Sequence, residues 1–402
     1  MEAQRIADGG AQILQACGTG YSTRARVAAQ AALLHAPSVD AAARFPSEAF
    51  AAIKEQRLLG VMVPEALGGE GATVAELADV CFILGQGCAS TALIFAMHQI
   101  KMACIVRHAK GNPALERILR EVGTKQLLLA SSTTEGQAGG NVRSSEAPVE
   151  HVGDQVTLER KATVISYAME ADGIVTTARR APDAAASDQV LLVLLKRDYT
   201  LERLQSWDTL GMRGTHSEGF TLRARASAQQ ILAEPYEKIH SQTMVPHAHI
   251  LWGSVWAGIA AAATAKAQAF VRNALRSSGG QMPPGAAHFT QAASSLRTLR
   301  GVLSSALRSY QAVMMDEKAL GALEFQTMIT LTKVQASELA AATVLAALRA
   351  CGLSGYRNDS EFSVGRHLRD ILSAPLMINN DRILANLAMT SVMTSLPTSI
   401  SG

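Results

Sequence analysis

The 402-residue sequence predicts an α+β protein in three parts: an N-terminal α-helical domain (residues 1–125), a central antiparallel β domain (126–238) and a C-terminal four-helix bundle (239–402). Three observations predict this order. Apolar residues recur at helical spacing up to about residue 125, short strand-like runs alternate with polar turns up to about 235, and four long helical runs follow Val245. Alternating βαβ units are absent, which argues against a Rossmann fold.

The N-terminal part has helices with recognisable ends. In SEAFAAIKEQRLLG, we expect Ser47 to be the N-cap and Gly60 the C-cap. A longer helix is expected in TVAELADVCFILGQG, and a third in STALIFAMHQIKMACIVRHA, where Ser90 is the expected cap. A turn then leads into NPALERILREVG, which completes the helical part.

The strands and the bundle helices follow in order. The predicted strands are QLLLASST, QVTLER, GIVTTA, QVLLVLL and GFTLRA, and RAPDAAASDQ is a predicted surface loop. The predicted bundle helices are HILWGSVWAGIAAAATAKAQAFVRNALR, FTQAASSLRTLRGVLSSALRSYQAVM, EFQTMITLTKVQASELAAATVLAALRAC and DRILANLAMTSVM. The insert SSGGQMPPGAAH is too rich in Gly and Pro to be helical.

Composition narrows the class of protein. Hydrophobic residues make up 48% and charged residues 18%, which predicts a packed soluble protein. The net charge is +3 without a Lys/Arg run, so we expect no nucleic-acid partner. Five cysteines without a CxxC pair predict no disulfide framework and no metal site, and they suit the cytoplasm. The N-terminus lacks a secretory pattern, and the alanine-rich run AGIAAAATAKAQAF is expected in a buried helix, so we expect no membrane insertion.

Three motifs occur in a fixed order: TTEGQAGGNV, WDTLGMRGTHSEGF and CGLSGYRNDSEFSVGRHLRD. With the helix–sheet–helix layout, they make the chain resemble acyl-CoA dehydrogenase family flavoproteins over nearly its full length. LGMRGTHS is the most specific match, because it resembles the family pattern LGxRGTxS almost position for position. The resemblance implies FAD, bound in extended form between the β domain and the bundle.

The resemblance places one group of residues around the flavin ring. Ser132 and Thr134 precede the glycines of the first motif, and Thr134 matches the threonine beside the pyrimidine ring. In ATVISYAM, Ser166 matches the hydroxyl residue near the reactive flavin nitrogen, and Val164 stands where an aromatic residue usually covers the ring. The alternative for Ser166 is a strand serine bonded to its neighbour.

A second group matches the residues that hold the diphosphate and adenosine, usually across a subunit boundary. Arg276 and Gln291 match the arginine and glutamine of that region, although SSGGQMPPGAAH replaces the family's short loop. Arg349 stands where the family has a glutamine facing the partner's cofactor, and Gly352 matches the first glycine of the family's G-G-x-G. An arginine there can pair with phosphate or cap its helix. FAD binding is therefore expected, with an altered grip on the diphosphate.

The family's catalytic glutamate has no counterpart in the sequence. Counting forward from Arg369-Asp370 places Ile378 at the glutamate position, with Met377 and Asn380 at the flanking tyrosine and threonine positions. The alternative glutamate position of some members falls on Ala248. Asp381 is one candidate base, although Asn380 or Asp381 is also well placed to cap the next helix.

Other candidates belong to the acyl pocket. His249 shares a helix face with Trp252 and Trp256, so it is a candidate acid, base or thioester contact, whereas core packing is the commoner outcome for two tryptophans at that spacing. His98, Gly140, Trp252, Trp256 and Met377 are the expected substrate contacts. Gly140 lies in the triplet Gly-Gly-Asn that replaces the family's Gly-Ser-Asp.

These observations lead to one reading with two alternatives. The leading reading is an FAD-dependent α,β-dehydrogenation of an acyl-CoA or carrier-bound thioester, with electron-transfer flavoprotein or O2 as the acceptor. The missing glutamate leaves open a flavin monooxygenase or oxidase of the same fold, and a non-catalytic partner subunit of a hetero-oligomer. A homodimer or homotetramer is the expected assembly.

Overall fold

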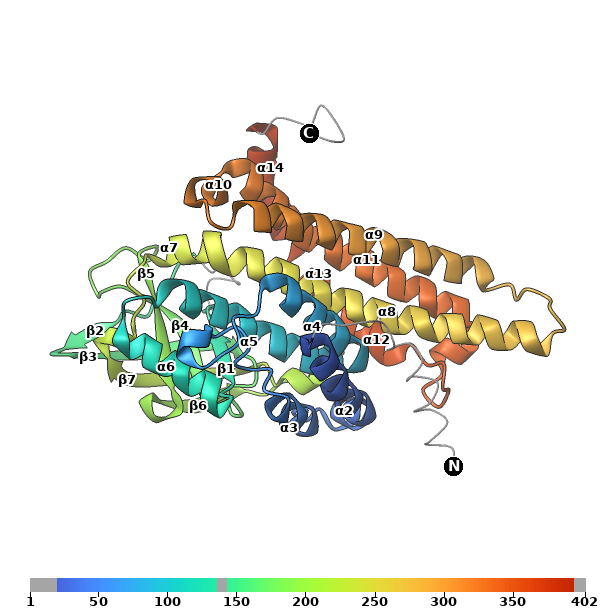
Figure 1. Ribbon diagram of the computed structural model, residues 1–402, viewed down its shortest axis with the longest axis horizontal. Coiled ribbons are helices and arrows are strands. Elements are labelled where there is room, and N and C mark those ends of the chain that lie inside the picture. Colours follow the sequence, from blue (N-terminus) through green and yellow to red (C-terminus); the bar gives the residue numbers. More distant parts are fainter. Residues whose placement is uncertain (1–19, 136–142, 394–402) are drawn as a thin grey trace.

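A computed structural model describes residues 20–135 and 143–393 (Figure 1). Its first part is helical, the middle part consists of two β-sheets, and the last part consists of long helices. The transition from helix to sheet falls between Lys125 and Leu129, and the return to helix falls between Ser227 and Tyr236. The structure confirms the predicted fold class.

The N-terminal helices pack as a layer beside the sheets and against helix α8. They are α2 (Gly20–Ala42), α3 (Ser47–Glu55), α4 (Val74–Gly87), α5 (Ala89–His108) and α6 (Pro113–Lys125). Helix α5 contacts α4, α8 and strand β1, which explains why it is buried along most of its length.

The predicted helix caps are wrong. Ser47 is the first residue of α3, after Pro46, and Ser90 lies inside α5, after the extended residue Cys88. Helix α3 ends at Glu55, so Gly60 lies beyond it. The N-cap positions are occupied by Pro46 and Cys88, so the two serines are not at the positions where a side chain caps the helix.

The central part contains a three-stranded sheet, β1–β4–β5, and a four-stranded sheet, β2–β3–β7–β6. The strands are β1 (Leu129–Ser132), β2 (Glu150–Val152), β3 (Gln155–Ile165), β4 (Gly173–Arg179), β5 (Gln189–Leu195), β6 (Tyr199–Gln205) and β7 (Glu218–Ser227). All pairs are antiparallel except β1–β4, which is parallel. The long connection from β1 to β4, through β2 and β3, allows this parallel pairing.

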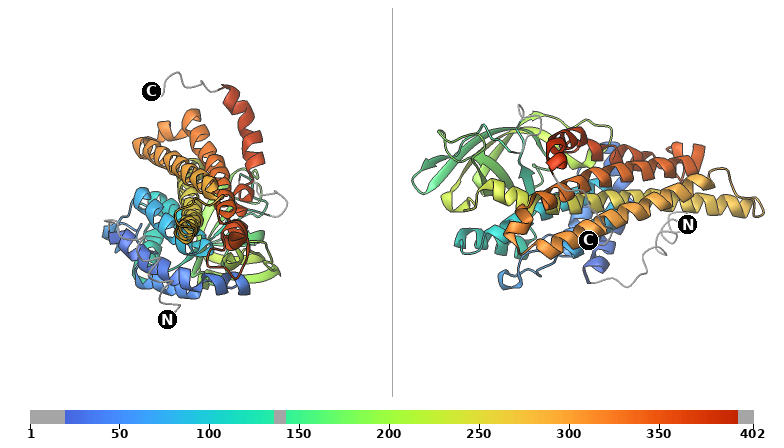
Figure 2. Two further views of the ribbon diagram at one scale, coloured as in Figure 1. Left: turned by 90° about the vertical axis from the view of Figure 1, so that its right-hand side faces the viewer. Right: turned by 90° about the horizontal axis from the view of Figure 1, so that it is seen from above.

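The C-terminal part is built on three long helices, with a shorter fourth. A short helix, α7 (Tyr236–Ile239), and a π-helical turn, η7 (His240–Met244), run directly into α8 (Val245–Ser277). The remaining helices are α9 (Ala286–Val313), α10 (Glu317–Gly321), α11 (Leu323–Tyr356), α12 (Gly365–Ile371), α13 (Ser373–Leu376) and α14 (Asn380–Met393). Helices α8, α9 and α11 contact one another, whereas α14 contacts α11 and leans away from the other two (Figure 2).

Three helical runs of the described chain are long and apolar enough to cross a membrane by length and composition: α5, Tyr236–Ser277 and α11. The share of the most apolar window that is buried inside the protein is 89% for α5, 78% for Tyr236–Ser277 and 50% for α11. Packing in the core therefore explains the apolar composition of the first two runs. In helix α11, half of the window is not buried.

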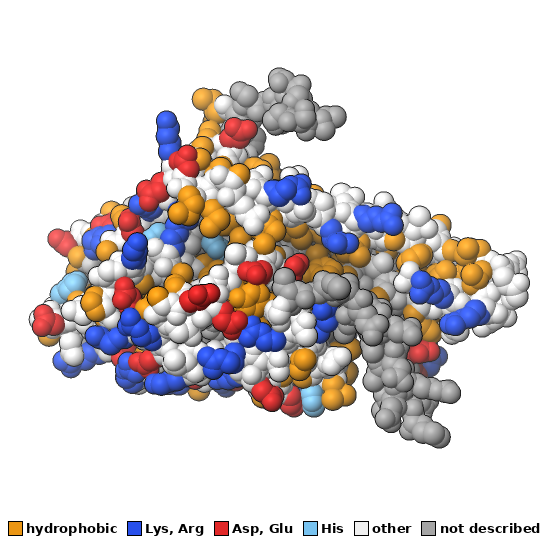
Figure 3. Space-filling model, in the orientation of Figure 1, with side chains coloured by type: hydrophobic (Ala, Val, Ile, Leu, Met, Phe, Trp, Pro, Cys, Tyr) orange, Lys and Arg blue, Asp and Glu red, His pale blue; other side chains and the backbone are white. Residues whose placement is uncertain are grey.

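The surface carries charges of both signs. On the face shown in Figure 3, Lys and Arg side chains are interspersed with Asp and Glu over the helical and sheet parts. Apolar side chains also reach this surface between the charged groups, notably along the bundle. The charge pattern on this face does not single out one region as a binding surface.

Candidate functional site

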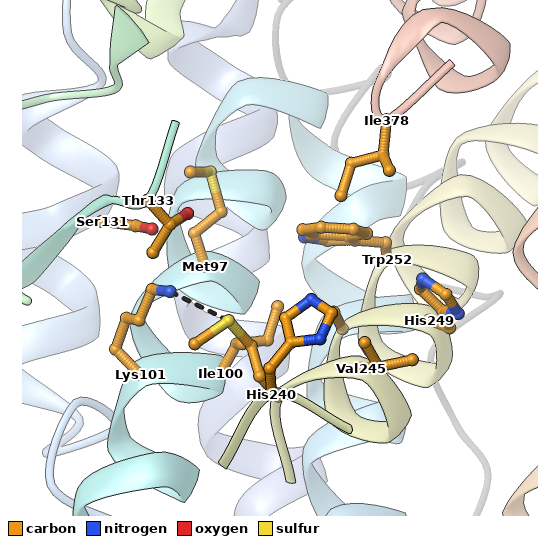
Figure 4. A pocket seen from close by; sticks show the side chains of 12 residues that line it. Met97, Ile100, Lys101, Ser131, Thr133, His240, Val245, His249, Trp252 and Ile378 are labelled. Atoms are coloured by element: carbon orange, nitrogen blue, oxygen red, sulfur yellow. Dashed lines mark hydrogen bonds between the residues drawn. The ribbon is translucent and has the colours of Figure 1, made fainter. Parts of the chain in front are cut away.

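A pocket lies where the N-terminal helices, the end of strand β1 and helix α8 meet (Figure 4). It contains about 450 Å³ of empty space and is partly open to solvent. We call it the α5–α8 pocket. The residues that line it are Met97, Ile100 and Lys101 of α5, Ser131 and Thr133 at the end of β1, His240, Met244, Val245, Ala248, His249 and Trp252 of η7 and α8, and Ile378 before α14. All three parts of the chain therefore contribute to one cavity.

Strand β1 presents alternate side chains to this pocket. Ser131 and Thr133 line it, whereas Ser132 and Thr134 do not, as the period of two in a strand requires. The Ser132 hydroxyl is buried without a hydrogen-bond partner among the described residues, and Thr134 is half-buried. Ser132 and Thr134 were the residues expected at the flavin, whereas the alternation of the strand brings their neighbours Ser131 and Thr133 to the pocket.

Ser166 and Val164, expected beside the flavin ring, lie at the irregular end of β3. The pairing of β3 with β7 shifts register between Ala162 and Ile165, and Val164 inside this irregularity is 37% exposed. Ser166 is buried, and its hydroxyl lies 2.8 Å from the hydroxyl of Ser217 in the LGMRGTHS motif. Ser166 is thus bonded to a neighbouring serine, which was the alternative to a flavin contact. Neither Ser166 nor Val164 lines the pocket.

Two of the sequence motifs are bonded to each other. The backbone N–H of Met212 donates to Asp370 Oδ1 at 2.7 Å, and Arg369 Nε donates to the carbonyl oxygen of Leu210 at 3.1 Å. Arg369 also forms an ion pair with Asp40. Burial raises the pKa of Asp370 to about 6. We call the Met212–Asp370 and Leu210–Arg369 contacts the motif clamp, because they hold the start of the C-terminal segment against the β domain.

The segment after the clamp brings Ile378 to the pocket. Ile378 is 38% exposed and adopts φ of 52°, a left-handed conformation that is unusual for a β-branched residue. Asn379 caps α14, because its Oδ1 accepts the backbone N–H groups of Asp381 and Arg382. The cap expected at Asn380 or Asp381 is therefore at Asn379. Asp381 is exposed and does not line the pocket, so the structure does not support its role as a base.

Asn380, expected to face the cofactor, instead ties α14 to α11. Its Oδ1 accepts from Lys333 Nζ at 2.6 Å, and its Nδ2 donates to Ser337 Oγ at 3.0 Å and Glu338 Oε1 at 2.7 Å. Lys333 is buried, and its ammonium lies 5.8 Å from the centre of the Trp256 ring. The polar groups of Asn380 are therefore used inside the protein.

His249 does reach the pocket, in a neutral form. Its Nδ1 lies 2.9 Å from the carbonyl oxygen of Ile329, so this nitrogen carries the proton and donates. Burial, with a smaller contribution from the nearby charge of Lys333, lowers the pKa of His249 to about 4. A general base works best with a pKa near the working pH. His249 is thus a weak base at neutral pH, with Nε2 available as an acceptor.

The two tryptophans of the predicted helix face differ in position. Trp252 lines the pocket, and its ring centre lies 6.2 Å from that of His249. The buried Trp252 N–H has no acceptor among the described residues. Trp256 is 2% exposed and does not line the pocket. The core role is therefore correct for Trp256, whereas Trp252 is available to a ligand.

His98 has a structural role in place of the expected acyl contact. The backbone N–H of Leu129 donates to His98 Nδ1 at 3.0 Å, so His98 Nε2 carries the proton and donates to the carbonyl oxygen of Leu59 at 2.9 Å. Both ring nitrogens are occupied, and burial lowers the pKa of His98 to about 4. Of the other predicted substrate contacts, Met377 packs against the core without lining the pocket, and Gly140 lies outside the described residues.

No Asp or Glu lines the pocket among the residues that the structure describes. Glu135, which follows Thr134, is buried and paired with Arg160 at 3.4 Å. It also accepts the Ser145 hydroxyl at 2.8 Å and the Glu146 N–H at 2.6 Å. This carboxylate therefore anchors its own loop.

The residues expected at the far end of FAD lie at the opposite end of the bundle. Arg276, Gln291, Arg349 and Gly352 are all exposed. Arg276 follows Trp252 by 24 residues on α8, which corresponds to roughly 36 Å along the helix axis. Gly352 has a φ of 55° and marks a kink in α11. A single chain does not bring these residues to the α5–α8 pocket.

Two polar residues that line the pocket were not expected from the sequence. Lys101 of α5 and His240 of η7 line it, together with Met97, Ile100 and Met244. The signal for Lys101 is a single lysine inside the apolar run ALIFAMHQIKMACIV. No comparable signal in the sequence points to His240, because the π-helical turn sets its direction.

Two family models match the chain. The model of the acyl-CoA dehydrogenase N-terminal domain matches residues 22–117, and that of the acyl-CoA dehydrogenase C-terminal domain matches residues 250–376. The first match covers the helices on one side of the pocket, and the second covers most of α8 to α13.

The chain is also similar to individual proteins. A cyclohex-1-ene-1-carbonyl-CoA dehydrogenase of Geobacter metallireducens is 30% identical over 197 residues, which is 48% of this chain and about half (51%) of that relative. The FMN-bound dibenzothiophene monooxygenase TdsC of Paenibacillus sp. A11-2 superposes with a TM-score of 0.82 at 16% identity, over 94% of this chain and 98% of that one. Butyryl-CoA dehydrogenase of Megasphaera elsdenii gives 0.76 at 16% identity, over 94% and 99%. With its fold and both domain models in agreement, the chain belongs to the acyl-CoA dehydrogenase family, whose members are flavin-dependent oxidoreductases.

Proposed function

We propose that this flavin-dependent oxidoreductase uses O2 as its oxidant, as a monooxygenase or oxidase, and that its substrate binds in the α5–α8 pocket. The observation that carries the proposal is the lining of the pocket: it contains Ile378, which counting from Asp370 matches to the family's glutamate, and it contains no carboxylate among the described residues. The proposal therefore favours the alternative that needs no α-proton abstraction over the dehydrogenation that leads the sequence-based reading.

The surroundings of the pocket fit a flavin ring at the β1 edge. Ser131 and Thr133 offer hydroxyls there, and the buried Trp252 N–H, which also lines the pocket, lacks an acceptor among the described residues. Such groups can serve the oxygen and nitrogen atoms of a ring system. A bound flavin, once reduced by an external donor, would supply the two electrons with which one atom of O2 enters the substrate and the other becomes water.

The chemistry of the pocket explains why dehydrogenation ranks second. Removal of an α-proton needs a base with a pKa near neutrality, placed beside the substrate. His249 lines the same pocket as Ile378, but its pKa of about 4 makes it a poor base. The apolar Ile378 side chain can instead help to exclude water from the reacting centre. The similarity to a cyclohex-1-ene-1-carbonyl-CoA dehydrogenase keeps the thioester reaction as the second candidate.

We also propose that one chain alone holds the ring and the first phosphate of the flavin, as FMN requires. This revises the expectation of FAD. It is supported by the separation of Arg276 from Trp252, roughly 36 Å along α8, and TdsC has been solved with FMN. FAD would need the exposed arginines of a second copy. Release of the flavin by heat, followed by chromatography against FMN and FAD, identifies which one is bound.

A homo-oligomer remains part of the proposal. It is supported by large apolar side chains exposed on the C-terminal helices: Leu345 and Leu353 on α11, Leu376 on α13 and Met389 on α14 are 48%, 72%, 73% and 75% exposed. Exposed apolar surface of this kind is typical of an interface. Light scattering after size-exclusion chromatography measures the oligomeric state.

The reaction type is tested with flavin-loaded protein. Under anaerobic conditions we expect no bleaching of the flavin by cyclohex-1-ene-1-carbonyl-CoA or butyryl-CoA, and after chemical reduction we expect rapid reoxidation by air. The Ile378→Glu variant restores a carboxylate and is expected to gain slow bleaching by a thioester. Stoichiometric bleaching of the wild-type protein by a thioester would contradict the proposal.

A further inference from the structure

Lys101 is a buried ammonium in an apolar helix. It is 3% exposed and lies on α5 among residues that are almost all buried. Burying a charged group without a partner is unfavourable, so lysines in such places are rare unless they are paired or functional. The position of Lys101 therefore calls for a chemical explanation.

The protein gives Lys101 little compensation. Its Nζ lies 3.4 Å from the Met244 sulfur, a weak acceptor, whereas an ammonium has three N–H donors. None of the ion pairs between described residues includes Lys101, and the buried carboxylate of Glu135 is paired with Arg160. Burial lowers the pKa of Lys101 to about 8, and Arg160 adds a like charge. The amine is thus mostly protonated at pH 7, without an anionic partner from the described chain.

The ammonium and the apolar surfaces face one cavity. Figure 4 shows Lys101 on one side of the pocket, near Ser131 and Thr133, and Trp252 and Ile378 on the opposite side. A ligand with a flat or branched apolar body and one negative end would match both sides at once.

We infer that Lys101 binds an anionic oxygen of the substrate, a carboxylate or a phenolate, while the apolar body of the substrate packs between Trp252 and Ile378. The inference rests on the proposed function only in taking the α5–α8 pocket as the substrate site. It names the substrate class: a small apolar acid or phenol that carries its own negative charge.

Calorimetric titration tests this with matched probes. Benzoate and benzamide share their shape but differ in charge, and 4-nitrophenolate represents the phenolates. We expect benzoate or 4-nitrophenolate to bind wild-type protein at least roughly tenfold more tightly than benzamide, because a charge-assisted hydrogen bond is lost with the amide. Which of the two anions binds more tightly separates carboxylate from phenolate recognition.

Variants assign the preference to Lys101. Lys101→Met removes the buried charge at similar length, and we expect it to fold and to bind benzoate and benzamide equally. Lys101→Arg keeps the charge and should retain most of the preference, and Lys161→Met, at an exposed lysine of β3, should leave it unchanged. Equal binding of benzoate and benzamide by the wild type, or no binding of any probe, would overturn the inference.

The flavin content of each variant is measured separately by absorbance. A Lys101→Met protein that keeps its flavin but loses the anion preference supports the inference. Loss of flavin with unchanged benzoate affinity overturns it, because Lys101 would then contact the cofactor. A wild-type protein that binds benzoate selectively but fails to react with O2 would contradict the proposed reaction while leaving the Lys101 site in place.

Discussion

The two ends of the helical bundle differ in how much of a binding site one chain builds. At the junction with the β domain, the α5–α8 pocket is lined from all three parts of the chain, and the motif clamp holds its last wall in place. At the distal end, Arg276, Gln291, Arg349 and Gly352 are exposed, and they lie far from that pocket. One chain therefore builds the α5–α8 pocket by itself, whereas it does not bring the residues expected to hold a diphosphate to that pocket.

The largest expected effect is on the free energy of unfolding, and it should differ between a buried arginine of the β domain and an exposed arginine at the distal end of the bundle. Arg160→Met leaves the buried Glu135 without its partner and should lower the free energy of unfolding by about 3–5 kcal/mol, measured by urea denaturation. Arg276→Met, at an exposed position, should change it by less than about 0.5 kcal/mol. Equal effects of the two substitutions would remove the contrast between the ends.

The next effect depends on pH. Burial lowers the pKa of His98, His247 and His249 to about 4, below the ordinary value of 6.5. The folded state therefore binds fewer protons than the unfolded state between these values, so stability present above pH 6.5 is lost as the pH falls towards 4. We expect a loss on the order of 2 kcal/mol per histidine between pH 7 and 5.

His98→Gln should reduce the loss of unfolding free energy on acidification, which denaturation at pH 7 and pH 5 measures. Asp370 acts in the opposite sense, because its pKa is raised to about 6 and its protonated form favours the folded state as the pH falls. Between pH 7 and 8, wild type and His98→Gln should change equally. An identical acid loss in both proteins would show that His98 is not held neutral by burial.

A smaller effect concerns cofactor choice at the distal end. Charge reversal of Arg276 and Arg349 to Glu should weaken FAD by at least roughly tenfold if FAD reaches these residues of a second copy, and should leave FMN within about twofold. Fluorescence titration of flavin-free protein measures both. Unchanged FAD affinity would exclude the distal end from cofactor binding.

The smallest effect is expected at Asp381. Asp381→Asn removes a negative charge from the first turn of α14, which should lower the free energy of unfolding by about 0.3–1 kcal/mol. Flavin reduction and reoxidation rates should stay the same, because Asp381 is exposed and does not line the pocket. A loss of turnover beyond about tenfold would return Asp381 to the chemistry.

Much of the fold was predictable from local patterns. The helix–sheet–helix order follows from a change in apolar periodicity that survives in the structure. The parallel pairing of β1 with β4 was not predictable, because it depends on which strands meet after a long connection. The caps at Ser47 and Ser90 failed for a local reason: Pro46 and Cys88 occupy the N-cap positions.

The location of the candidate site was predictable from the sequence, but only some of its residues were. Counting from Asp370 identifies Ile378, and the shared helix face identifies His249 and Trp252. All three residues line the pocket. Histidine and tryptophan often bind ligands, but His98 is hydrogen-bonded to backbone groups of Leu59 and Leu129, and Trp256 is packed in the core. Only the fold determines which face of a helix packs in the core, so the sequence does not identify Lys101 and His240 as pocket residues.

The motif clamp determines which residue of the following segment reaches the pocket. Asp370 is fastened to the Met212 N–H, and eight residues later the chain presents Ile378 to the cavity in a left-handed turn. The identity of the residue that closes the cavity is thus set by chain length as much as by sequence. Deleting one residue of α13 would bring Asn379 into that place, and inserting one would bring Met377, so the spacing itself is part of the chemistry.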